Sequence, residues 1–314
     1  MGESKLRSAY RTLLPTRRAF LSSTLGVGAY VLLPDLTRAG SSGGIRALAF
    51  DGDVLLAAEA TLNVSEDSGG TWAERTTPGK VLAIATNPDR PGRVAAGLEK
   101  GGFALSADGG ATWRIGNAGL PNGEVNALAI ASRDPDLIYA AVRGDGLYKS
   151  EDAGETWTLA MDRPWLKEAE RDPLTLASVD LETGMGGIWI YAGTEMGLTR
   201  VPDCFCRWQD VQPGNAMDAL VSGDAPPPEN PLPEGEPVLS LASSPAKPER
   251  LYAALPSGIW TSGDGGVVWT QVADGAATVI AVHPRDETYI AAVIGDALKL
   301  SRDGGANWVA TATG

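Results

Sequence analysis

An eight-residue pattern, Ser-x-Asp-x-Gly-x-x-Trp, recurs along this chain and constrains its fold more than any other feature. Near-copies begin at five serines, Ser65, Ser106, Ser150, Ser262 and Ser301. An eroded sixth copy, residues 201–208, keeps the aspartate and the tryptophan five positions apart. Successive tryptophans are 41, 44, 51, 61 and 39 residues apart. Repetition at intervals of about 40 residues indicates a repeat protein in which each copy is one structural unit.

The motif is typical of a tight turn between two strands. Aspartate accepts hydrogen bonds from nearby backbone N–H groups and glycine tolerates positive φ, so both are common in turns. A short apolar run leads into each copy, and the tryptophan opens the next strand, where we expect the indole to pack between neighbouring repeats. Loss of one such buried indole would cost about 3–5 kcal/mol. We assign these structural roles to Asp67, Trp72, Asp108, Trp113, Asp152, Trp157, Asp203, Trp208, Asp264, Trp269, Asp303 and Trp308.

Each repeat carries signals for four short strands. An inner strand of small apolar residues, such as 81–85, is followed by a turn, a second strand such as 138–141, the strand leading into the motif, and a short strand after the tryptophan. Four strands in about 40 residues form one blade of a β-propeller. The sequence therefore predicts an all-β, six-bladed propeller of four-stranded blades over residues 44–314, with blades at 44–79, 80–123, 124–172, 173–236, 237–275 and 276–314. Seven blades is the alternative, but no unused stretch of blade length remains for it, and the sequence does not show how the ring is closed.

The repeated motif resembles the Asp-box, or bacterial neuraminidase repeat, of the sialidase-like superfamily of β-propellers. The first three copies match every motif position, and Val268 and Asn307 replace the threonine in the last two. The resemblance extends from Gly44 to the C-terminus and implies a propeller of this superfamily. It decides little about function, because relatives include sialidases, two-propeller xyloglucanases, sortilin-type receptors and photosystem II assembly factors.

The first 39 residues do not belong to the repeat. A basic stretch containing Arg17 and Arg18 precedes an apolar run of about 15 residues, shorter than the roughly 20 that a spanning helix needs. The segment resembles a twin-arginine signal peptide, with cleavage expected after Ala39. We therefore expect a folded protein exported to the periplasm or the extracellular space, with an uncleaved membrane anchor as the alternative.

Charge and composition exclude several classes of function. The first 39 residues hold six of the 26 basic and two of the 39 acidic residues, so the remainder has a net charge of about −17. That sign argues against nucleic acid and anionic membrane surfaces as partners.

The scarcity of histidine and cysteine limits the possible catalytic and metal sites. His283 is the only histidine, and its His-Pro context predicts a turn residue rather than part of a triad or metal site. For Cys204 and Cys206, a local disulfide or free thiols are preferred over a metal, and no cofactor is expected.

Two insertions break the even spacing, at 161–173 and 212–237. We expect the first to form a short helix that presents Trp165, and the second to be a polar, proline-rich surface loop. Both join the outer strand of one blade to the inner strand of the next, so they should share a face with the loops between second and third strands, opposite the motif turns. The binding hypothesis places Trp165, Arg163, Lys167, Arg143, Glu195 and Lys100 on that face. The alternative is a merely solvated charged rim.

Sialidase activity is disfavoured by the sequence. Sialidases carry an arginine triad and a Tyr/Glu nucleophile pair, whereas Arg46 is the only candidate for the first arginine here. Four tyrosines occupy equivalent second-strand positions, which indicates packing: Tyr139, Tyr191, Tyr252 and Tyr289. A xyloglucanase-like cleft would need a second propeller. The sequence therefore favours an exported, monomeric, non-catalytic scaffold that binds a protein partner or assembles a complex, with a glycoside hydrolase or carbohydrate-binding protein as the alternative.

Overall fold

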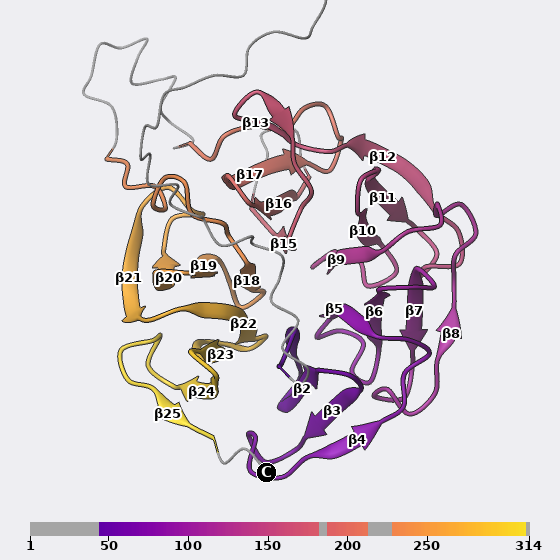
Figure 1. The fold of residues 1–314 in the computed structure, drawn as a ribbon, viewed down its shortest axis with the longest axis horizontal. Coiled ribbons are helices and arrows are strands. Elements are labelled where there is room, and N and C mark those ends of the chain that lie inside the picture. Colours follow the sequence, from indigo (N-terminus) through magenta and orange to yellow (C-terminus); the bar gives the residue numbers. More distant parts are fainter. Residues whose placement is uncertain (1–43, 182–186, 213–227, 312–314) are drawn as a thin grey trace, which may run out of the picture. The chain divides into compact units, whose positions relative to one another are not determined.

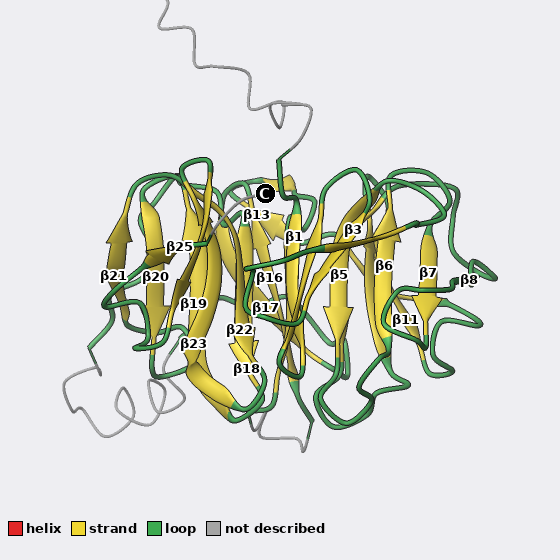
Figure 2. Cartoon of the chain, turned by 90° about the horizontal axis from the view of Figure 1, so that it is seen from below, coloured by secondary structure: helices red, strands yellow, loops and turns green. Residues whose placement is uncertain are grey.

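The computed structural model describes residues 44–181, 187–212 and 228–311, and these residues form strands and turns without a helix. Six antiparallel sheets surround a common axis (Figure 1), and their strands run between two loop-bearing faces (Figure 2). The predicted six-bladed propeller is thereby confirmed. The predicted signal peptide and most of the second insertion lie outside the described residues. Within the described residues no helix is long and apolar enough to cross a membrane.

In each of the first three blades the strands lie in chain order across the sheet. Blade 1 contains β1 (Ala47–Asp51), β2 (Val54–Ala58), β3 (Leu62–Ser65) and β4 (Ala73–Arg75). Blade 2 contains β5 (Val81–Thr86), β6 (Val94–Leu98), β7 (Phe103–Ser106) and β8 (Arg114–Ile115). Blade 3 contains β9 (Val125–Ile130), β10 (Ile138–Val142), β11 (Gly146–Ser150) and β12 (Thr158–Asp162).

The other three blades follow the same plan, except that blade 4 is incomplete. Blade 4 contains β15 (Thr175–Val179), β16 (Trp189–Thr194) and β17 (Gly197–Pro202), and an isolated bridge between Arg200 and Gln209 stands where a fourth strand would lie. Blade 5 contains β18 (Ser240–Ser244), β19 (Lys247–Leu255), β20 (Gly258–Ser262) and β21 (Trp269–Asp274). Blade 6 contains β22 (Ala277–His283), β23 (Asp286–Ile294), β24 (Ala297–Ser301) and β25 (Val309–Ala310).

The first insertion corrects one prediction. Instead of a helix it forms a β-hairpin of β13 (Trp165–Leu166) and β14 (Ala169–Glu170). The two residues between these strands, Lys167 and Glu168, have φ values of 49° and 64°. Positive φ at both central positions is the conformation of a tight hairpin turn, whose twist matches that of the flanking strands. The charged run that resembles a helical segment is therefore a hairpin tip.

The ring closes by packing between the first and last blades, because each blade is built from its own continuous stretch of chain. Phe50 of β1 lies 5.0 Å from Tyr289 of β23 between ring centroids. The Tyr289 hydroxyl donates a hydrogen bond to Ser68 Oγ at 2.9 Å, and the Arg302 guanidinium stacks over the Tyr289 ring at 3.9 Å. Among those of residues 44–311 that the structure describes, no strand of one blade joins the sheet of the other across this seam. His283 is buried here as the last residue of β22, rather than in the turn as predicted, and contacts Asp53 at 3.0 Å.

The hydrophobic core lies mainly between neighbouring blades. One cluster joins blades 2 and 3, and within it Phe103 packs edge-on against Trp157 at 5.0 Å between centroids. Trp269 likewise packs against blade 4 residues such as Val179 and is 1 % exposed. Each motif indole packs in a cluster that its blade shares with the preceding one. The sequence predicts packing between neighbouring repeats, without saying which neighbour. The four second-strand tyrosines are all buried, which confirms their packing role, and burial raises the pKa of Tyr139, Tyr191 and Tyr252.

The six motif turns are here called corners and are numbered by blade, so that the eroded copy at 201–208 is the fourth corner. The other five corners have the same pattern of hydrogen bonds. In the second corner Ser106 Oγ donates to Asp108 Oδ1 at 2.8 Å and accepts from the N–H of Gly110 at 2.8 Å. Asp108 also accepts from the backbone N–H and the hydroxyl of Thr112, at 2.8 and 2.6 Å. These bonds lower the pKa of Asp108 to about 2, chiefly through Thr112. The same serine–aspartate and serine–glycine bonds recur at Ser65, Ser150, Ser262 and Ser301.

Candidate functional site

The corners and the first insertion lie at opposite ends of the strands. Corner residues bond to the turns between first and second strands, as Gly109 N–H does to the Gly92 carbonyl at 2.8 Å. At the other end, the N–H of Gly144, between the second and third strands of blade 3, donates to Asp172 Oδ1 of the first insertion at 2.8 Å. The insertion therefore shares a face with the loops between second and third strands, as the sequence predicts. We call this the insertion face.

Arg163 fixes the base of the β13–β14 hairpin. Its guanidinium forms ion pairs with Glu170 and with Asp172, the latter at 3.4 Å. Desolvation opposes the charge of Arg163, but the bonds from these two carboxylates outweigh it and raise the pKa of the guanidinium. The hairpin therefore projects from a charged clamp, and Arg163 serves first to position it.

The hairpin presents one large apolar side chain to solvent. Trp165 is 66 % exposed, so this residue is largely accessible to a ligand. Next to it at the tip, Lys167 pairs with Glu234 at 2.6 Å, which raises the pKa of Lys167 and lowers that of Glu234. Both side chains of that pair are exposed, so it orients the tip more than it stabilises the fold.

The chain that leaves the fourth corner runs back along β17 and borders a groove from the side of blade 4. Trp208 donates a hydrogen bond from Nε1 to the carbonyl oxygen of Asp162, the last residue of β12, at 2.8 Å. Gln209 then exchanges two backbone bonds with Arg200 of β17, at 3.0 and 2.7 Å. Arg200 itself stacks over the Trp189 ring at 4.1 Å. The chain after the corner is thus fixed at two points beside the hairpin.

A groove of about 640 Å³ lies between these two structures. On the hairpin side it is lined by Arg163, Trp165 and Glu170, and on the corner side by Arg207, Trp208 and Asp210. Met161, Asp162, Gln209 and Gln212 complete the lining. Two indoles and several planar polar groups thus share one depression at the rim of the propeller, between blades 3 and 4.

Only part of the predicted site gathers in this groove. Trp165 and Arg163 line it, whereas Lys167 lies at the hairpin tip and Arg143 pairs with Glu124 at 2.8 Å. Lys100 and Glu195 are exposed on loops that do not line the groove. Sequence reasoning assigned Trp208 only a structural role and missed Arg207, Gln209, Asp210 and Gln212. The eroded motif copy at 201–208 was the sequence feature that could have indicated these residues, because the regular corner is lost just before the groove-lining segment.

The axis of the ring offers a second cavity, of about 150 Å³, lined by inner-strand residues of all six blades such as Phe50, Leu128 and Ile280. Its described lining contains no carboxylate, histidine or cysteine. Glycoside hydrolysis commonly uses a pair of carboxyl groups, and none of the described residues that line this cavity supplies one. In the described part of the chain, no three His, Cys, Asp or Glu side chains gather as a metal site.

No protein-family profile and no curated protein sequence matches this chain. Solved structures show the fold. The chain is a β-propeller. The xyloglucanase of glycoside hydrolase family 74 from Xanthomonas campestris aligns over 84 % of this chain and 45 % of its own, with 19 % identity and a TM-score of 0.53. The β-propeller domain of Cps50 (Swd1) from Myceliophteria thermophila aligns over 82 % and 97 %, with 14 % identity and a TM-score of 0.51.

A protein of unknown function from Bacteroides thetaiotaomicron is also similar, with 10 % identity over 82 % of this chain and 69 % of its own, and a TM-score of 0.57. The chain spans less than half the length of the family 74 enzymes that it matches, at 45, 46 and 38 %. Because the same fold serves proteins of different kinds, function has to be argued from the groove rather than from the propeller.

Proposed function

We propose that this propeller is an exported, non-catalytic scaffold whose rim groove binds an extended segment of a partner protein. One observation carries the proposal: Trp165 stands 66 % exposed on a clamped hairpin, at the edge of a groove of about 640 Å³. Exposed tryptophans on rigid supports are the side chains on which binding energy concentrates in protein interfaces. The polar lining around the indole supplies hydrogen-bond partners for a peptide backbone.

Among the described residues blade 4 has only the isolated Arg200–Gln209 bridge in place of a fourth strand, which favours an extended peptide as the occupant. The backbone N–H and carbonyl of Arg200 point to the outer side of β17, where both bond to Gln209. Leu198, two residues earlier, faces the same side, because backbone groups alternate along a strand. Within the described ranges, no backbone bond from a fourth strand reaches Leu198. A peptide strand can add to such an edge.

Export and superfamily membership are parts of the same proposal. The twin-arginine-like segment within residues 1–39 supports delivery of a folded protein to the periplasm or the extracellular space. The Cys204–Cys206 disulfide suits an oxidising compartment. The corner networks support membership of the Asp-box propellers.

A carbohydrate ligand is the second candidate. Trp165 and Trp208 line one groove together with planar polar side chains such as Arg207 and Gln209, and such a combination can stack on and hydrogen-bond to sugar rings. Hydrolysis is less favoured, because Glu170 is already engaged by Arg163.

Arrays of peptides and of glycans, probed with the same labelled protein, separate the two candidates. We expect a set of peptides to bind the wild-type protein and to lose that binding in the Trp165→Ala variant. Val309→Ala is the matched control, because Val309 is 71 % exposed but lies on β25 of blade 6. Binding to glycans alone, or turnover of aryl glycosides that a single carboxylate substitution abolishes, would replace the scaffold proposal with the carbohydrate one.

A further inference from the structure

The fourth corner cannot form the network that holds the other five. Val201 stands where those corners have serine, and Arg207 stands where the first three have threonine. Both hydroxyl groups that bind the corner aspartate are therefore missing. Asp203 remains, and its carboxylate lies against Gly187, where an added Cβ would come within 1.9 Å of Oδ1. The Asp203 N–H still donates to the Ile188 carbonyl at 3.0 Å, but the bonds from serine and threonine to the aspartate have no counterpart here.

The backbone of the fourth corner keeps only part of the left-handed conformation of the others: those have positive φ at both the fourth and the fifth motif positions, whereas here Phe205 has it and Cys204 does not. The fifth motif position has φ values of 84° at Gly69 and 87° at Gly110, and a φ of 53° at Phe205. Positive φ is unfavourable for a bulky side chain. Three contacts hold Phe205 there: its N–H bonds the Pro202 carbonyl at 2.8 Å, its ring lies 5.8 Å from Tyr139, and the cysteines on either side of it are bonded to each other.

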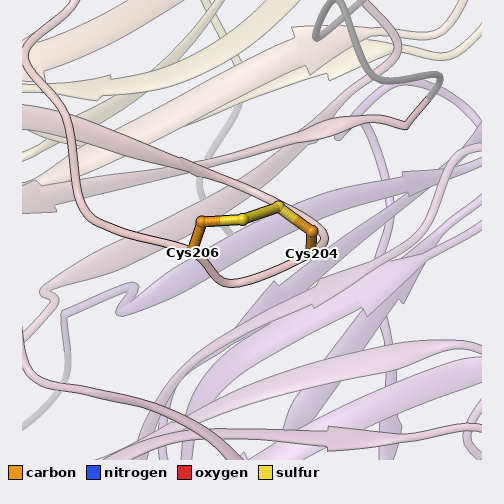
Figure 3. Close-up of a disulfide and its surroundings, with 2 residues drawn as sticks. All are labelled: Cys204 and Cys206. Atoms are coloured by element: carbon orange, nitrogen blue, oxygen red, sulfur yellow. A yellow bond between two sulfur atoms is a disulfide. The ribbon is translucent and has the colours of Figure 1, made fainter.

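Cys204 and Cys206 close a disulfide across the tip of this turn (Figure 3), with their Cα atoms 5.5 Å apart. Both cysteines are exposed, and they are the only two in the chain. Arg207 and Trp208, which follow directly, line the rim groove. We infer that the Cys204–Cys206 disulfide is a reducible modification site that replaces the missing hydrogen-bond network and locks the corner wall of the groove.

The reaction partner is a dithiol, either a small molecule or a protein with a paired-cysteine site. One thiolate of the dithiol attacks Sγ of Cys204 or Cys206, the sulfur–sulfur bond breaks, and a mixed disulfide forms. The second thiolate of the dithiol then displaces the protein sulfur. The dithiol becomes a disulfide, and the protein gains two electrons and two protons. The other five corners contain no cysteine, so this reaction addresses the fourth corner alone.

The test uses the whole protein, dithiothreitol as the dithiol and native conditions. We expect thiol alkylation to label neither cysteine before reduction and both after it. Hydrogen exchange in a peptide covering 203–212 should then accelerate about ten-fold, while a peptide covering the fifth corner, 262–269, keeps its rate. Free thiols in the air-oxidised protein, an unchanged exchange rate after reduction, or equal acceleration at both corners would each overturn the inference.

Two variants separate loss of the lock from loss of the fold. In the double variant Cys204→Ser/Cys206→Ser, hydrogen exchange at 203–212 should have the rate of the reduced protein and should not change when dithiothreitol is added. Adding Val201→Ser, Phe205→Gly and Arg207→Thr rebuilds the regular motif around Asp203. In that variant we expect slow exchange to return without any disulfide, and continued fast exchange there would contradict the proposed equivalence of the two locks. Neither result depends on whether the groove binds a peptide.

Discussion

Trp208 donates its indole N–H to the carbonyl oxygen of Asp162 at 2.8 Å, which ties the fourth corner to the end of the outer strand of blade 3. The corresponding indoles of Trp113 and Trp269 bond within their own corners, to the carbonyls of Gly110 and Gly266 at 3.1 and 2.8 Å. Trp157 bonds instead to the carbonyl of Gly116 in the preceding blade at 2.9 Å, so Trp208 shares with the regular third corner a bond to the neighbouring blade. The bond to Asp162 holds Trp208 in one wall of the groove.

Replacing the indole by a phenyl ring should destabilise the two kinds of corner differently. Trp208→Phe removes one bond at a half-exposed position, and we expect a loss of about 1 kcal/mol in the free energy of unfolding. Trp269 is 1 % exposed, so Trp269→Phe also leaves a buried carbonyl unpaired and a gap, and should cost about 2–4 kcal/mol. Urea denaturation of the three proteins measures both values. Equal losses would show that the inter-blade bond of Trp208 is as important to stability as a buried corner bond.

The corner carboxylates predict a loss of stability in acid. Hydrogen bonds lower the pKa of Asp67, Asp108, Asp152 and Asp303 to about 2, below the ordinary 3.8. Because the folded state holds their ionised form, their contribution is present above pH 3.8 and is lost as the pH falls toward 2. We expect the melting temperature to fall steeply in that window. Asp108→Asn should melt lower at neutral pH and show a shallower acid dependence, and an identical pH profile would count against this account.

Alanine substitutions at two glycines with similar backbone conformations distinguish the cost of backbone strain from the cost of a packing clash. Gly154 in the third corner has a φ of 79°, and an added Cβ would lie 2.1 Å from the Phe103 ring. Gly144 has a φ of 75° and no atom within 4 Å of such a Cβ. We expect Gly144→Ala to cost about 1 kcal/mol from backbone strain alone. Gly154→Ala should cost about 1–3 kcal/mol more, because the core has to move.

Chemical denaturation of this pair checks both numbers. If the two substitutions are equally costly, the corner is looser than its contact with Phe103 implies.

The repeated motif made the architecture predictable. Its spacing set the number of blades, and the alternation of strand and turn placed Trp165 on the face opposite the corners. Because the same side-chain network recurs five times, each copy of the motif reports the same local structure. The repetition predicted that Trp157 and Trp269 pack between neighbouring repeats, and the structure shows that the neighbour is the preceding blade.

The groove was not predictable in the same way, because it arises where the repetition fails. The segment from Arg163 to Asp172 has the charge density of an exposed helix, yet Lys167 and Glu168 turn it into a hairpin. Nothing local in the sequence pairs Trp208 with Asp162, since that contact depends on how blades 3 and 4 meet. The missing serine and threonine of the fourth copy marked the place without showing its shape.

Affinity for an array-selected peptide tests the central claim most directly. Titration of wild type, Trp165→Ala and Val309→Ala with the same labelled peptide gives three dissociation constants. We expect Trp165→Ala to weaken binding about 30-fold or more, as loss of a tryptophan anchor does, and Val309→Ala to leave it unchanged. Equal affinity of wild type and Trp165→Ala would contradict the assignment of the groove as the binding site.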